Sequence, residues 1–164
     1  MLFRSTTDLG NPTCIHPARK REVGERLAFL ALANDYGVTG LPAPAPVYKS
    51  MERDGNKLVL TFDNLPVRAQ NGVDSFVAFG PDGYLRPGGF EIAGEDRVFH
   101  PAVANFKYWD NRIEVSSDRV PEPVAVRYAF RNYCPEANVV TTMGQPLAPF
   151  RTDDWPLDDI GEIR

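Results

Sequence analysis

Residues 58–62, which read LVLTF, decide the fold because their large apolar side chains recur at every second position. In an extended strand alternate side chains point to the same side, so Leu58, Leu60 and Phe62 share one face. β-prone runs recur further along the chain, at residues 90–92, 112–115 and 124–130. The period of two therefore predicts several short strands with one buried face each.

Turn signals separate these runs. Asp54-Gly55 and Asp110-Asn111 are dipeptides that tolerate the positive φ angles of tight hairpins. The 164 residues include 15 prolines and 13 glycines, a content that disfavours a helix bundle and favours short segments joined by turns. The sequence thus predicts a mainly β fold, with a small antiparallel β-sandwich over residues 41–150.

One amphipathic α-helix is expected ahead of the sandwich, at residues 17–36. Its apolar positions follow the three-and-four spacing of one helix face: Val23, Leu27, Leu30 and Ala31. Gly37 suits the left-handed conformation that ends many helices. The sequence LPAPAP at residues 41–46 cannot continue a helix, so the first unit is predicted to span residues 1–40.

The end of the sequence is acidic. Residues 151–164 carry five acidic and two arginine side chains, which is −3 of the formal net charge of −4. We treat this stretch as a separate tail, but Phe150 and Trp155 beside the charges predict that part of it packs back on the protein. The overall acidity argues against a nucleic-acid partner.

Composition also bears on membranes and metals. No run approaches the roughly 20 apolar residues of a membrane helix, and residues 1–10 lack the apolar core of a secretory signal. We therefore expect no membrane partner. Cys14 and Cys134 show no CxxC spacing, so no metal site is expected, and the sequence leaves open whether they pair.

Two histidines are the candidates for proton transfer at neutral pH, because imidazole titrates in that range. His100 lies in RVFHPA between predicted strands, where a surface turn histidine is the common case. His16 lies in a loop directly before the predicted helix. Spacing alone favours an ordinary helix-entry residue at His16 as well.

The segment DLGNPTCIHPARKREVGERLAFLALANDYG (residues 8–37) resembles the closing part of the catalytic domain in the sialate O-acetylesterase family of SGNH-type serine hydrolases. The segments GFEIAGED (89–96), VAVRYAF (124–130) and PFRTDDW (149–155) are similar to the C-terminal β-domain of that family. The resemblance covers most of the chain. It implies that the helix is the remainder of an α/β SGNH hydrolase domain and that no cofactor is needed.

The resemblance implies a carbohydrate esterase that removes acetyl groups from sugars. In such enzymes a serine attacks the acetyl ester, while a histidine accepts the serine proton and returns it to the sugar hydroxyl. His16 matches the position of that general base. The family also implies export to the periplasm or the medium.

The nucleophile expected from the resemblance lies before the histidine segment, and no serine of this chain matches it. Ser75, in the pair Asp74-Ser75, follows His16 and has the wrong order and context. Thr13 stands where an orienting aspartate would precede His16, which leaves Asp8 as the candidate carboxylate. We therefore expect the chain alone to be inactive, with its serine supplied by a complementary N-terminal esterase segment.

A non-catalytic alternative stays open. In it the β-sandwich is a glycan-binding or scaffold module, with Tyr84 and Trp109 as the aromatic side chains that stack on sugar rings. The apolar helix stripe needs a cover in either case, from the missing esterase segment or from self-association. The sequence does not specify which acetylated sugar is bound.

Overall fold

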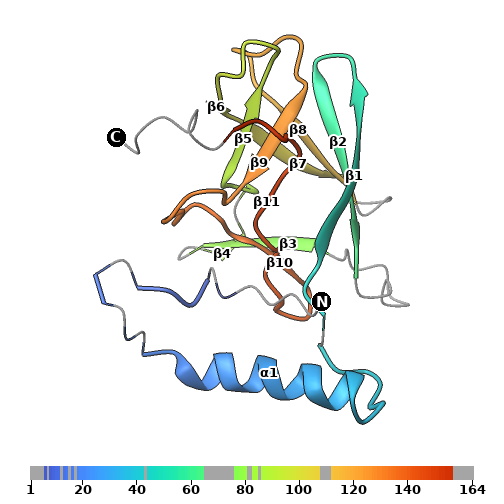
Figure 1. Cartoon of the computed structure of the whole chain (residues 1–164), viewed down its shortest axis with the longest axis vertical. Coiled ribbons are helices and arrows are strands. Elements are labelled where there is room, and N and C mark those ends of the chain that lie inside the picture. The colour runs from blue at the N-terminus through green and yellow to red at the C-terminus, as the bar shows by residue number, and fades with distance from the viewer. Residues whose placement is uncertain are drawn as a thin grey trace.

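The structure is a computed structural model that describes residues 6, 8–11, 13–14, 16, 18–42, 44–64, 76–80, 83–84, 86–107 and 112–156. Within these residues the chain forms one helix, α1, followed by short strands (Figure 1). Every strand pairing is antiparallel. The predicted fold class, mainly β with a single helix at the start, is confirmed.

The first sheet contains the LVLTF stretch at its centre. Its strands run in the order β1 (Val47–Asp54), β2 (Lys57–Asp63), β8 (Arg112–Ser116) and β7 (Val103–Lys107). Leu60 of β2 lies opposite Met51 on one side and Ile113 on the other. Leu58, Leu60 and Phe62 are all buried, as the period of two predicts. A two-residue turn joins β1 to β2.

A second sheet covers this buried face. Its order is β11 (Phe150–Arg151), β9 (Ala125–Tyr128), β5 (Phe90–Ala93) and β6 (His100–Pro101). Side chains of both sheets meet in one apolar cluster that includes Leu60, Ile113, Ile92, Val126 and Tyr128. The Tyr128 hydroxyl accepts a hydrogen bond from the Val139 amide at 3.2 Å, which satisfies this buried polar group. The two sheets therefore form the expected sandwich.

A third, smaller sheet closes one end of the sandwich. Its order is β10 (Val139–Thr141), β3 (Phe76–Gly80) and β4 (Gly83–Tyr84). In Figure 1 it lies between the sandwich and α1. The proline-rich connector reaches the core at this end: Pro46 is buried, and its carbonyl accepts a hydrogen bond from the Ala148 amide at 3.1 Å.

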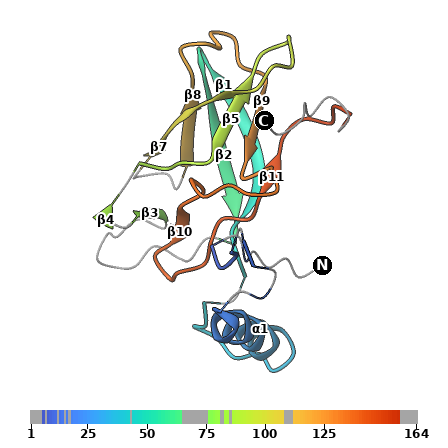
Figure 2. The ribbon, with the colours of Figure 1, turned by 90° about the vertical axis from the view of Figure 1, so that its left-hand side faces the viewer.

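Helix α1 (Lys20–Asn34) is shorter than predicted and stands at one end of the molecule in both views (Figures 1 and 2). It begins at Lys20 because Arg19 has a ψ of 46°, outside the helical range. Gly37 has a φ of 66°, which confirms the predicted cap. In the described part of the chain, no helix has the length and apolar character that would let it cross a membrane.

The side of α1 that is covered differs from the predicted stripe. Leu30 is buried together with the charged Arg26, whereas 56% of Leu27 is exposed. Leu32, on another side of the helix, is 38% exposed. Arg26 is buried where Asp8, in the segment before α1, binds its guanidinium. Much of the apolar surface of the helix thus faces solvent.

Part of the acidic tail packs against the sandwich, as Phe150 and Trp155 predict. Asp153 is fully enclosed and receives both a 2.9 Å and a 2.7 Å hydrogen bond from the Arg127 guanidinium on β9. The Trp155 ring lies 5.6 Å from the ring of Phe99, and Arg127 lies 3.9 Å over that same ring. The proposed boundary between residues 150 and 151 therefore runs through β11.

Candidate functional site

The loop before α1 presents His16 to solvent. The His16 amide donates a hydrogen bond to Cys14 Sγ, and the Cys14 thiol donates one to the His16 carbonyl, both at 3.4 Å. These contacts hold the backbone of the loop. His16 is exposed, and among the residues that the structure describes its imidazole has no hydrogen-bond partner.

The loop is further shaped by Asn11 and by the start of the helix. Asn11 Oδ1 accepts hydrogen bonds from the Thr13 amide and from the Thr13 hydroxyl, both at 2.9 Å. This arrangement is typical of asparagine turns, in which the side chain replaces a backbone acceptor. Thr13, which stands at the position where an orienting carboxylate was expected, is thus part of this turn.

Asp8 is held by the helix. Its two carboxylate oxygens accept hydrogen bonds of 2.7 Å and 2.6 Å from the Arg26 guanidinium. Its carbonyl accepts a further one from Arg19 at 3.3 Å. Such a two-pronged arginine pair is among the stronger contacts in proteins, and the Arg26 side chain is only 10% exposed. The structure therefore joins Asp8 to Arg26 and brings no described carboxylate to His16.

The sugar-binding candidates are placed only in part. Tyr84 lies in β4, opposite Phe79. Trp109 and Ser75 lie outside the described residues. The roles assigned to Tyr84 and Trp109 therefore stay predictions.

The remaining titratable candidates are His100 and the two cysteines. His100 is half-buried in β6 and pairs with Ile92 of β5. Cys134 is partly buried, and burial raises the pKa of its thiol; both it and Cys14 are free thiols. Among the residues that the structure describes, no group of three His, Cys, Asp or Glu side chains could hold a metal ion.

Sequence reasoning missed the two buried arginines. Arg26 and Arg127 each hold a carboxylate from a distant part of the chain, Asp8 and Asp153 respectively. An isolated arginine in a helix or strand normally indicates a solvent-exposed position. The only available signal was that Arg127 sits within the apolar run VAVRYAF, where a buried charge needs a partner.

Comparison with solved structures relates the chain to a known enzyme. No protein-family model matches the chain, and no curated protein does. A carbohydrate acetylesterase from Xanthomonas citri, known from a crystal structure, is 43% identical over 90% of this chain, with a TM-score of 0.77. The chain spans 31% of the length of that enzyme. By sequence and by fold, the chain is therefore related to a carbohydrate acetylesterase.

Proposed function

We propose that this chain is the C-terminal part of a carbohydrate O-acetylesterase of the sialate O-acetylesterase type, with His16 as its general base. The observation that carries the proposal is the 43% identity to the Xanthomonas citri acetylesterase over nine-tenths of the chain. The exposed position of His16 supports it, because a general base must come within hydrogen-bond reach of its proton donor.

In the proposed reaction, a serine from a complementary N-terminal esterase segment attacks the carbonyl carbon of the acetyl ester. His16 accepts the serine proton, and the sugar oxygen leaves with that proton, which releases the free hydroxyl and an acetyl-serine. Water then attacks the acetyl carbon, and the imidazole takes the water proton. The bond between the acetyl carbon and the serine oxygen breaks, acetate leaves, and the imidazole returns the proton to the serine oxygen. Asp8 stays engaged with Arg26, so we propose that a carboxylate other than Asp8 orients His16.

Helix α1 provides the surface for the complementary segment. Leu27 and Leu32 are exposed on different sides of this helix, and burying such side chains stabilises an interface by about 1.5–3 kcal/mol each. We propose that the esterase segment covers them. Self-association of this chain through α1 is the competing arrangement, and sedimentation velocity of the chain with and without the segment separates the two.

The experiment is a chimera that keeps the Xanthomonas citri enzyme but replaces its matching part with this chain. We expect the chimera to release acetate from an acetylated sugar, and His16→Ala to lower kcat/KM by roughly a thousandfold or more. His100→Ala is the matched control and should leave the rate unchanged. Full activity of the His16→Ala chimera would overturn the assignment of His16, and a folded but inactive chimera would overturn the proposed activity.

A further inference from the structure

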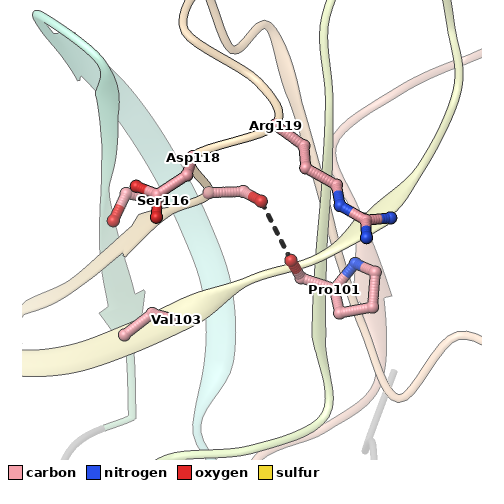
Figure 3. Close-up of a pocket in the computed structure, with 6 residues that line it drawn as sticks. Pro101, Val103, Ser116, Asp118 and Arg119 are labelled. Carbon is pink, nitrogen blue, oxygen red and sulfur yellow. Dashed lines mark hydrogen bonds between the residues drawn. The ribbon is translucent and has the colours of Figure 1, made fainter.

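A cavity of about 360 Å³ lies where the turn after β8 meets β6 and β7 (Figure 3). Its lining consists of Pro101, Val103, Ser116, Ser117, Asp118 and Arg119. Ser116 pairs with Lys57 at the β1–β2 hairpin, and that hairpin is at the end of the molecule away from α1 (Figure 1). The volume falls in the lower part of the range for small-ligand sites, roughly 300–1,000 Å³.

The backbone around the cavity is fixed by contacts that need no ligand. The Ser117 hydroxyl donates a hydrogen bond to the Pro101 carbonyl at 3.1 Å. The Val120 amide donates one to the Ser117 carbonyl at 3.0 Å, and the Val120 side chain is buried in the core. Val103 and Ser116 face each other across the β7–β8 pair. A backbone held in this way loses little conformational entropy when the site binds a ligand.

The cavity combines an apolar surface with polar groups on its two sides. Pro101 and Val103 supply the apolar surface, and 49% of Val103 is exposed. In Figure 3 Asp118 lies on the Ser116 side, while Arg119 extends along Pro101. Within the part of the chain that the structure describes, neither charged side chain has an ion-pair partner.

The chemistry of these groups selects among ligand classes. Asp118 and Arg119 are exposed, so Asp118 would repel an anion and Arg119 would repel a cation, while a purely apolar molecule that covered them would remove their hydration without replacing its hydrogen bonds. A neutral polyhydroxy molecule avoids all three costs, because its hydroxyls donate to a carboxylate and accept from a guanidinium. Its C–H face can lie on Val103 and Pro101.

We infer that this cavity binds a neutral saccharide. The inference does not involve His16 and stands whether or not the proposed esterase function is correct. It also differs from the aromatic stacking expected at Tyr84 and Trp109, because the recognition here comes from a carboxylate, a guanidinium and a hydroxyl on an aliphatic surface.

The test follows amide chemical shifts of the ¹⁵N-labelled chain during titration with cellotriose, xylotriose and lactose, and separately with N-acetylneuraminic acid. At least one neutral sugar should shift the amides of Val103 and of residues 116–120, with saturation in the millimolar range expected of a small open site. N-acetylneuraminic acid should cause smaller shifts of the same amides. The inference is wrong if no neutral sugar shifts these amides, or if the acid binds as well as the best neutral sugar.

Two variants locate the contacts. Asp118→Asn and Arg119→Met should each weaken binding of the best neutral sugar by roughly five- to tenfold, because each loses a charge-assisted hydrogen bond. Asp54→Asn and Arg86→Met are the matched controls, since both residues are exposed and lie outside the cavity lining. Unchanged binding in both cavity variants, or equal weakening in the controls, would show that the sugar binds elsewhere.

Discussion

Arg127 carries a positive charge on the face of β9 that points away from the core, yet only 8% of its side chain is exposed. The fork of two hydrogen bonds to Asp153 balances that charge, and the ring of Phe99 covers one face of the guanidinium at 3.9 Å. Both faces of strand β9 are therefore buried. Val126 and Tyr128 belong to the apolar core, and Arg127 lies on the opposite face.

Removal of the Arg127 charge should be costly. Arg127→Met keeps much of the aliphatic volume but leaves Asp153 enclosed without its partner, which we expect to lower the free energy of unfolding by about 3–5 kcal/mol. Urea denaturation followed by fluorescence measures the change. The control is Arg21→Met, whose exposed pair with Glu25 should contribute nothing measurable. Equal midpoints for the Arg127 variant and the parent protein would contradict this account.

Acid should weaken the same contact. Burial raises the pKa of Asp153, but the hydrogen bonds and charge of Arg127 lower that pKa by more, so the net shift is downward. A carboxyl group with a lowered pKa in the folded state stabilises the fold above its ordinary pKa, near 3.9, and loses that contribution as pH falls further. The free energy of unfolding should therefore drop below about pH 4. The drop should be smaller in Asp153→Asn, measured by urea denaturation at each pH; parallel pH profiles would refute the role of Asp153.

At the scale of elements, the period of two predicted the strands whose side chains form the core. β2, β5, β8 and β9 all contain apolar residues on one buried face. β1 escaped prediction because it lies at the edge of its sheet and exposes most of its side chains, including Lys49 and Glu52. The position of β1 depends on backbone hydrogen bonds to β2, and such bonds do not require a particular pattern of side chains.

The candidate site was less predictable than the fold. A resemblance of sequence segments made His16 the candidate general base, a role that stays a prediction, whereas the partner of Asp8 depends on how the loop folds back on α1. Arg26 lies far enough from Asp8 in sequence that no local spacing rule connects them. The cavity between Pro101 and Arg119 likewise arises from residues that meet only after β6, β7 and β8 have paired.

The residue directly before β5 is a glycine that no other residue should replace. Gly89 has a φ of 84°, and a Cβ atom there would lie 2.8 Å from the Ala137 Cα. Gly89→Ala should therefore lower the free energy of unfolding by about 2 kcal/mol or more, from backbone strain and displacement of the facing segment. Chemical denaturation measures this. Gly24→Ala in α1 is the control, because its Cβ meets nothing and alanine favours a helix; a smaller loss at Gly89 than at Gly24 would argue against the close contact.

At the scale of the whole molecule, the sandwich and α1 contribute unequally to the core. Residues 1–40 add Leu9 and Leu30 to the buried apolar side chains of the described part, whereas the remaining core belongs to the sandwich region. We propose that residues 41–164 fold without the helix, in keeping with the predicted boundary near residue 40.

Two truncations test this division. Residues 41–164 should unfold cooperatively, with a urea midpoint close to that of the full chain. Residues 1–150 should be much less stable, because they lack Asp153 and Thr152. The Thr152 amide donates a hydrogen bond to the Val126 carbonyl at 3.0 Å, and the Thr152 hydroxyl accepts one from the Val126 amide at 2.9 Å. Circular dichroism during urea titration gives both midpoints. The reverse order of stability would mean that α1 belongs to the same cooperative unit as the sandwich.

The ion pairs of Arg26 and Arg127 also affect where trypsin can cleave the folded protein. Trypsin cuts only after it has drawn an arginine or lysine side chain into its own acidic specificity pocket. Arg26 and Arg127 are each clasped by a carboxylate within the fold, whereas Arg119 is free to enter such a pocket. Trypsin should therefore cleave after Arg26 or Arg127 only when local unfolding breaks the ion pair of that arginine. The order in which the two sites are cleaved then shows which ion pair breaks first.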